Sequence, residues 1–176
     1  MEEDLMWYLG YGSNLNRQRF LCYIKGGKPE YGTRSNSGCT NDNLPPEDRP
    51  FKIKYRLYFG LPDGVTGTDN WGKGGVAFID PDDVDDKWTL GRIWRITQDQ
   101  YEQIRDQEGR EWYNREILLG EVDGIPVKTI THDVKFKNLC DPSGSYERTI
   151  IEGLMETYGM SIEEASIYLK KRYPRD

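Results

Sequence analysis

The stretch YLGYGSNLNRQRF, residues 8–20, runs from apolar and aromatic residues through two glycines into a polar segment. Gly10 and Gly12 allow backbone shapes that other residues resist, and they let a ligand approach the main chain closely. Ser13 and Asn14 both favour the N-cap position of a helix. The stretch therefore predicts a strand, a tight turn and a helix start, in that order, and backbone N–H groups at such a corner suit an anion.

The rest of the chain alternates between strand and helix patterns. The segment FKIKYRLYF, residues 51–59, places apolar residues on one face and basic residues on the other, which is typical of a half-buried strand. Asp123-Gly124 is a strong signal for a two-residue hairpin turn. Further strands are expected over residues 5–11, 74–80, 90–96, 115–122 and 125–131, and helices over residues 14–22, 97–109, 146–158 and after Ser161. Short, mostly antiparallel strands with helices between them predict an α+β domain with a small curved sheet or barrel.

Composition argues against several classes of protein. The net charge of −6 disfavours a broad nucleic-acid-binding face. The acidic N-terminus does not resemble a signal peptide, and no stretch is long enough to span a membrane. Three widely spaced cysteines, Cys22, Cys39 and Cys140, fit a reducing cytosol better than a disulfide framework, so we expect a cytoplasmic protein.

The predicted domain organisation is simple. The 176 residues suit one domain, residues 1–176, with a sizeable core. Residues 25–50 are rich in glycine, proline, asparagine and serine, and they predict a long loop insertion. Long loops inside compact domains are usually functional or disordered. Two interpretations of this loop stay open: a lid or wall of a pocket, and a plain surface insertion.

The residue types available for catalysis are restricted. His132 is the only histidine, so a histidine-rich zinc site is impossible, and no CxxC pair occurs. Histidine-assisted catalysis by serine or cysteine has one candidate base, and a lone histidine is more often a surface or packing residue. We therefore expect an enzyme without metal or cofactor, which works with carboxylates, tyrosines and backbone dipoles.

Glu108 lies on an unexpected face of a predicted helix. Thr97 and Gln100 have the spacing of a capping box and begin about three turns of helix. At about 100° per residue, Glu108 falls above Tyr101 and near Ile104, on the side that faces the core. Burial and the negative end of the helix dipole both raise the pKa of a carboxyl, toward the range that a general acid or base needs. In the alternative, the helix end frays and Glu108 reaches water.

Six motifs follow one another along the chain: YLGYGSNL, YFG, WGKGGVAFI, LGRIWRI, IRDQEG followed by Tyr113, and DPSGSYERTIIEGLMETYGM. In this order they resemble the γ-glutamylcyclotransferase family. The first motif looks like the family's substrate loop, and the fifth looks like its catalytic segment, in which the glutamate before the glycine is the base. The others resemble its central strands and its C-terminal segment. The resemblance covers most of the chain except residues 25–50.

The resemblance implies a fold, a reaction and a site. The implied fold is α+β, a small mixed β-barrel with surrounding helices. The implied reaction cyclises the γ-glutamyl group of a γ-glutamyl amino acid or amine to 5-oxoproline and releases the amine, without metal or redox cofactor. The implied base is Glu108. The family's substrate loop carries over to Tyr8, Leu9, Gly10, Tyr11, Gly12 and Ser13, and Asn14 joins them in the expected substrate-binding set.

This chemistry agrees with the residue types. Backbone N–H groups at Gly12, Ser13 and Asn14 are expected to hold the α-carboxylate of the substrate or the oxyanion of the tetrahedral intermediate. A buried glutamate with a raised pKa can take a proton from the α-ammonium and return it to the leaving amine. The expected partner is a small-molecule γ-glutamyl substrate, with no nucleic acid and no membrane, and a homodimer stays open.

Two departures from the family's pattern concern the substrate. A family tyrosine that has been linked to substrate binding is replaced by Ile130 or Thr131, so the glutamyl group is held differently or the substrate differs. Asn14 stands where the glutathione-specific branch usually has leucine, which argues against glutathione.

Two other classes of function stay open. The Gly10–Ser13 corner could hold phosphate in a nucleotide-binding module, but no lysine follows within the loop and no parallel βαβ pattern surrounds it. The same fold could also bind a γ-glutamyl or acidic ligand without catalysis. Glu108 argues against pure binding, because a binder gains nothing from a buried unpaired acid. Tyr113 and Tyr146 could add hydroxyl groups to the site, although structural roles are the default for a chain with twelve tyrosines.

Overall fold

The protein is built around one mixed sheet. The structure is a computed structural model that describes residues 4–174. Six strands pair in the order β6-β7-β1-β5-β2-β8, and only the β1–β7 pair is parallel. A separate hairpin of β3 and β4 stands beside the sheet. The strands are β1 (Leu5–Gly10), β2 (Asp48–Leu61), β3 (Gly67–Thr68), β4 (Gly72–Lys73), β5 (Val76–Thr97), β6 (Arg115–Val122), β7 (Ile125–Thr131) and β8 (Asn138–Leu139).

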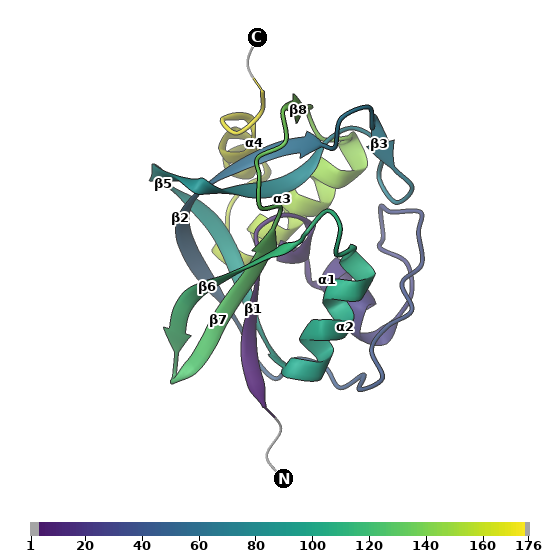
Figure 1. The fold of residues 1–176 in the computed structure, drawn as a ribbon, viewed down its shortest axis with the longest axis vertical. Helices are drawn as coiled ribbons and strands as arrows, with labels where there is room; N and C mark the ends of the chain where they lie inside the picture. Colours follow the sequence, from purple (N-terminus) through teal and green to yellow (C-terminus); the bar gives the residue numbers. More distant parts are fainter. Residues whose placement is uncertain (1–3, 175–176) are drawn as a thin grey trace.

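Helices pack around the sheet in two groups. In Figure 1, α1 and α2 lie next to each other at the lower right, and α3 and α4 lie above them. The helices are η1 (Ser13–Leu15), α1 (Arg17–Lys25), α2 (Gln98–Glu108), α3 (Gly144–Tyr158) and α4 (Ile162–Lys170). In residues 4–174, no helix combines the length and the apolar character needed to cross a membrane.

Most of the predicted elements are confirmed. Asp123 and Gly124 both have positive φ and form the hairpin turn between β6 and β7. The predicted capping boxes at the starts of α2 and α4 are both formed. The two strands predicted over residues 74–80 and 90–96 are one continuous strand, β5, which bends as it pairs with β2 through two register shifts.

The sheet is curved but does not close into the barrel that the resemblance implied. Among the described residues β6 pairs only with β7, and β8 only with β2. The curvature brings Thr131 of β7 against Ile79 of β5, where the Thr131 hydroxyl accepts from the Ile79 amide at 3.1 Å and donates to the Ile79 carbonyl at 2.6 Å. This contact is made by a side chain, and β5 and β7 form no backbone ladder there.

The first helix begins later than predicted. Ser13–Leu15 form only a 3-10 turn, and Asn16 is extended, with φ −86° and ψ 123°. Asn16 is the true N-cap of α1, because its side chain accepts from the Arg19 amide at 3.0 Å. Ser13 and Asn14 are therefore not helix caps, and the corner after β1 presents the N–H groups of a short turn instead of an α-helix N-terminus.

Strand β1 is buried on both faces, and its alternating side chains enter two different apolar cores. Trp7 and Leu9 belong to the larger apolar core, which includes residues of α3 and α4. Met6 and Tyr8 belong to a second core with residues of α1 and α2. Successive residues of a strand point to opposite faces. Tyr8 therefore points toward the α1 and α2 side, on which Glu108 also lies.

Candidate active site

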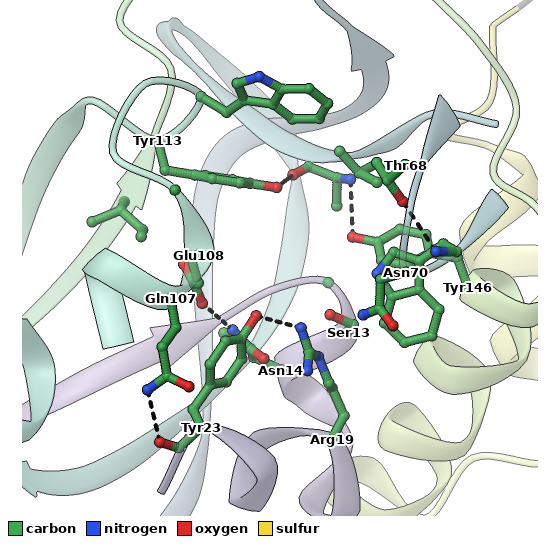
Figure 2. A pocket seen from close by; sticks show the side chains of 18 of the residues that line it. Ser13, Asn14, Arg19, Tyr23, Thr68, Asn70, Gln107, Glu108, Tyr113 and Tyr146 are labelled. Atoms are coloured by element: carbon green, nitrogen blue, oxygen red, sulfur yellow. Dashed lines mark hydrogen bonds between the residues drawn. The ribbon is translucent and has the colours of Figure 1, made fainter. Parts of the chain in front are cut away.

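A cavity of about 500 Å³ opens where β1 ends (Figure 2). Its walls come from the corner after β1, α1, the C-terminal end of α2, the loop of residues 26–47, the β3–β4 hairpin and the start of α3. The expected site residues that line it are Tyr8, Gly10, Tyr11, Gly12, Ser13, Asn14 and Glu108. Leu9 does not line the cavity, because its side chain points to the other face of β1 and is fully buried in the larger core.

Two side chains from two other elements converge on one carboxylate oxygen of Glu108. Tyr8 Oη donates to Glu108 Oε1 at 2.7 Å, and Asn14 Nδ2 donates to the same oxygen at 2.5 Å. Asn14 Nδ2 also donates to Tyr8 Oη at 3.2 Å. No residue within 4–174 bonds Glu108 Oε2, and Asn14 Oδ1 is buried without a partner among these residues. One oxygen of the acid and one oxygen of the amide thus stay available to a ligand.

The local sequence explains how Asn14 reaches Glu108. A Cβ atom at Gly10 would lie 2.5 Å from Asn14 Cβ, so only glycine lets Asn14 fold back over the end of β1. The corner is then held from β5. Trp94 Nε1 donates to the Asn14 carbonyl at 2.9 Å, and Arg92 Nη1 donates to the Leu15 carbonyl at 3.0 Å.

Burial raises the pKa of the Glu108 carboxyl. The hydrogen bonds from Tyr8 and Asn14, and the charges of Arg19 and Arg105, lower the pKa of this carboxyl, but they do not cancel the effect of burial. The residue is only half-buried and lines the cavity. A carboxyl with a raised pKa beside an open cavity suits a general base that must later act as an acid.

Two further tyrosines, Tyr113 and Tyr146, line the cavity and are labelled in Figure 2. Tyr146 Oη accepts from the Ala77 amide at 3.0 Å, and no acceptor for its own proton lies in the described part of the chain. Burial raises the pKa of Tyr146 to about 12, so its hydroxyl stays a neutral donor. Tyr113 Oη donates to the Ala77 carbonyl at 3.0 Å, which engages its proton. Of the two, Tyr146 has a proton to offer a ligand.

The loop of residues 26–47 forms part of the cavity wall. Arg34 and Asn36 from this loop line the cavity. Asn70 of the β3–β4 connection fixes the loop from one side, because its Oδ1 accepts from the amides of Thr33 and Arg34, each at 3.0 Å. Gln103 of α2 fixes the loop from the opposite side, because the Gln103 Oε1 accepts from the Thr40 amide at 2.7 Å. Of the two interpretations of this loop, the pocket wall is the one that the structure contains.

Sequence reasoning missed several cavity residues. The missed residues include Arg19, Tyr23, Asn36, Asn70, Trp71 and Gln107. A usable signal was present only for the first two. Arg19 and Tyr23 are four residues apart and therefore lie on one face of α1, although Tyr23 also packs into the second core with Phe20 and Ile24. The others come from loops or from the end of α2, where periodicity gives no direction.

The lone histidine and the cysteines do not line the cavity. His132 stacks on Phe136 with ring centroids 4.2 Å apart, and its Nδ1 contacts the Trp112 carbonyl at 3.0 Å. Cys22, Cys39 and Cys140 are free thiols. Within residues 4–174, no group of three or more histidine, cysteine, aspartate or glutamate residues is arranged to hold a metal ion.

The chain is similar in sequence to part of a longer curated protein. No family model matches the chain. Histone deacetylase 5 from Arabidopsis thaliana is 30% identical in a match 205 positions long, gaps included, and the match covers 94% of this chain and 30% of that protein. The chain therefore spans less than a third of the length of this curated relative.

Solved structures match over nearly the whole chain. A γ-glutamyl cyclotransferase is 21% identical with a TM-score of 0.65, and the match covers 98% of this chain and 90% of that one. An uncharacterized protein from Homo sapiens is 22% identical with a TM-score of 0.63, and the match covers 99% of this chain and 91% of that one. These likenesses establish a shared fold.

Proposed function

Because the chain has the γ-glutamylcyclotransferase-like fold, we propose that it is an enzyme that cyclises the γ-glutamyl group of a γ-glutamyl amino acid or amine to 5-oxoproline and releases the amine. One observation carries the proposal beyond the fold. Glu108 presents one free carboxylate oxygen to the cavity, while Tyr8 and Asn14 fix the other. An acid held in this way serves proton transfer better than mere binding, because binding needs no group with a raised pKa.

In the proposed reaction, the substrate α-ammonium gives a proton to Glu108 Oε2. Asn14 Oδ1 accepts from the same nitrogen and so orients its lone pair. The free amine attacks the γ-carbonyl carbon, a C–N bond forms, and a five-membered ring closes through a tetrahedral oxyanion. The C–N bond to the leaving group then breaks as Glu108 returns the proton to the leaving nitrogen. The ring nitrogen gives up its second proton to the leaving amine, which departs as an ammonium, and Glu108 is left ionised as at the start. Well-oriented intramolecular reactions reach effective molarities of about 10⁵–10⁸ M, so positioning supplies much of the rate.

Two negative charges of the substrate still need partners, the α-carboxylate and the oxyanion. In the proposal, the corner after β1 binds the first and Tyr146 binds the second. In the proposal, the N–H groups of Gly12, Ser13 and Asn14 face the α-carboxylate of the glutamyl group. The Tyr146 hydroxyl, whose oxygen already accepts from the Ala77 amide, donates its free proton to the oxyanion. Its pKa of about 12 keeps the hydroxyl protonated near neutral pH. No step needs a metal or a redox cofactor.

The two rival functions fit the site less well. A nucleotide-binding corner would use an α-helix N-terminus, but α1 begins only at Arg17, beyond the extended Asn16. A pure binding domain has no use for the Tyr8–Asn14–Glu108 arrangement. For the setting of the reaction we propose the cytoplasm, because the three cysteines are free thiols, and we propose no nucleic-acid or membrane partner.

A substrate panel tests the proposed function. The protein is incubated with γ-glutamyl amino acids and γ-glutamyl amines, and 5-oxoproline is measured by mass spectrometry. We expect 5-oxoproline from at least one member, at a rate that a metal chelator leaves unchanged. Tight binding of these compounds without any 5-oxoproline would favour the binding-domain alternative. Loss of activity with chelator and recovery with zinc would overturn the metal-free mechanism.

The pH profile tests whether Tyr8 tunes Glu108. The hydrogen bond from Tyr8 lowers the pKa of Glu108, so Tyr8→Phe should raise this pKa further. Glu108 must be ionised to accept a proton, so the acid limb of kcat/KM should move to higher pH. Tyr101→Phe is the matched control, because this hydroxyl donates to Glu116 and its residue does not line the cavity. A Tyr8→Phe profile that superimposes on that of Tyr101→Phe would remove Tyr8 from the mechanism.

A further inference from the structure

Arg19 is a deeply buried cation whose partners are all neutral. The residue is 5% exposed and lines the cavity, with its guanidinium beside Tyr23 in Figure 2. Nη1 donates to Asn36 Oδ1 at 2.7 Å, and Nη2 donates to Tyr23 Oη at 2.5 Å. Nε is buried and has no partner among residues 4–174. The planar group also lies over the rings of Tyr23 and Trp71, 4.2 Å and 5.5 Å from their centroids.

Other buried arginines of the protein have carboxylate partners. Arg92 pairs with Asp48 at 2.8 Å and with Glu156 at 2.9 Å, and Arg172 pairs with Asp85 at 3.1 Å. No carboxylate of the described chain forms an ion pair with Arg19. A buried charge without a counter-ion is costly, and arginine is well suited to bind a carboxylate through two parallel hydrogen bonds. The position of Arg19 at the cavity wall indicates that a ligand supplies the missing anion.

In the proposed reaction, the negative charge near Arg19 decreases further. Glu108 is close enough for the charge of Arg19 to lower its pKa, although the two form no ion pair. When Glu108 takes the substrate proton, it becomes neutral and stops compensating Arg19. The α-carboxylate of the glutamyl group is assigned to the corner after β1. A second carboxylate on the substrate would then balance the charge of Arg19 throughout the reaction.

The surroundings of Arg19 place this second carboxylate on the leaving group. Arg19 bonds Asn36 of the loop of residues 26–47, which also contributes Arg34 to the cavity wall. A second cavity of about 430 Å³ shares Arg34, Asn36 and Gln107 with the first, and its lining is polar. The loop side of the site is therefore polar, with Arg34 lining both cavities and Asp106 of α2 lining the second one.

Resting on the proposed function, we propose that Arg19 binds a carboxylate of the leaving group and thereby selects γ-glutamyl amino acids over γ-glutamyl amines that lack an acid. The guanidinium would add one or two charge-assisted hydrogen bonds to this carboxylate. Such bonds are worth about 10- to 100-fold in binding. Asn36 and Tyr23 keep the guanidinium in place when the site is empty.

The first test changes only the substrate. Wild-type protein is given γ-glutamyl-alanine and, separately, γ-glutamyl-alaninamide, in which a neutral amide of nearly the same shape replaces the leaving-group carboxylate. We expect a KM about 10- to 100-fold higher for the amide, with a smaller change in kcat. Equal KM values for the two substrates would overturn the inference, and this result does not depend on the folding of any variant.

The second test changes Arg19. Arg19→Gln should lose about 10- to 100-fold in kcat/KM with γ-glutamyl-alanine and should lose little with γ-glutamyl-alaninamide. Arg17→Gln is the matched control, because Arg17 lies on the same helix, is half-exposed and pairs with Asp48 outside the cavity. Arg19→Lys keeps the charge and should recover part of the preference for the acid.

The outcomes separate the two proposals. If wild-type protein forms 5-oxoproline but Arg19→Gln loses the same factor on both substrates, Arg19 holds the glutamyl end or the fold, and only the inference is wrong. Circular dichroism of the variant distinguishes those two causes. If wild-type protein forms 5-oxoproline from neither substrate nor from any member of the panel, the proposed function fails, and the inference fails with it.

Discussion

Glu108→Gln is expected to lower the turnover of γ-glutamyl substrates by about 10²- to 10⁴-fold, the usual contribution of general acid–base catalysis. Glutamine keeps the shape of the side chain and can still accept from Tyr8 and Asn14, but it cannot take the proton of the α-ammonium. One group performs both proton transfers in the proposed mechanism, so no second residue can replace it. The rate of 5-oxoproline formation at saturating substrate measures the effect.

Binding and stability should respond differently from turnover. Substrate affinity should fall little, because the corner after β1 holds the glutamyl group. Glu102→Gln serves as the control on the same helix, since Glu102 pairs with Arg110 and does not line the cavity. It should leave the rate nearly unchanged. A Glu108→Gln protein that turns over substrate at close to the wild-type rate would contradict the mechanism.

The sign of the stability effect follows from the raised pKa of Glu108. The folded protein raises the pKa of this carboxyl above its ordinary value of 4.5, so folding favours the protonated form. The stability that Glu108 contributes is fully present below its unfolded pKa and is lost as pH rises through the folded pKa. Glu108→Gln does not titrate. Its Tm should therefore equal or exceed that of wild type near pH 7, and the gain should disappear near pH 4.

Gly12→Val is expected to lower kcat/KM by about 10²-fold or more, because the cavity wall leaves no room for a side chain at this position. A Cβ atom at Gly12 would lie 2.8 Å from Ala77 Cβ and 2.9 Å from Tyr146 Oη. The corner must shift to relieve this contact, and a misplacement of about 1 Å can cost 10²-fold in rate. Substrate kinetics and thermal unfolding together measure whether the damage is to the site or to the fold.

Gly144→Val is the matched control for this substitution. Gly144 lies at the start of α3, where an added Cβ would meet no atom within 4 Å, and the residue does not line the cavity. We expect Gly12→Val to lose more activity than stability relative to this control. A Gly12→Val protein that folds, binds and turns over substrate normally would remove the corner from the site.

The position of Glu108 could be predicted because helix geometry determines it. The capping box at Thr97 and Gln100 sets the start of α2, and 3.6 residues per turn then place Glu108 with Tyr101 and Ile104. These two residues are fully buried, and Glu108 lies above them against Tyr8. The alternative of a frayed helix end is wrong, since α2 remains helical through Glu108.

The start of α1 could not be predicted from capping preferences alone. Ser13, Asn14 and Asn16 are all good caps, and local propensity does not choose among them. Tertiary contacts decide, because Asn14 turns to Glu108 and Asn16 Nδ2 donates to the Thr149 carbonyl of α3 at 3.1 Å.

The open sheet and the conformation of the loop of residues 26–47 also could not be predicted from the sequence. Where the open sheet curves back on itself, the Thr131 side chain bonds the backbone groups of Ile79, a contact between residues 52 positions apart. The loop takes its shape from side chains of distant elements, among them Asn70 and Gln103. Local patterns carry no information about such contacts, although the composition of the loop did mark it as irregular.

The most direct test of the central claim is a mass balance on wild-type protein with γ-glutamyl-alanine. Alanine, 5-oxoproline and glutamate are quantified together by chromatography with mass detection as the reaction proceeds near neutral pH. Intramolecular cyclisation predicts 5-oxoproline and alanine in equal molar amounts, with no glutamate. Glutamate and alanine in equal amounts, which would mean hydrolysis by water, or bound and unchanged substrate, would contradict the account.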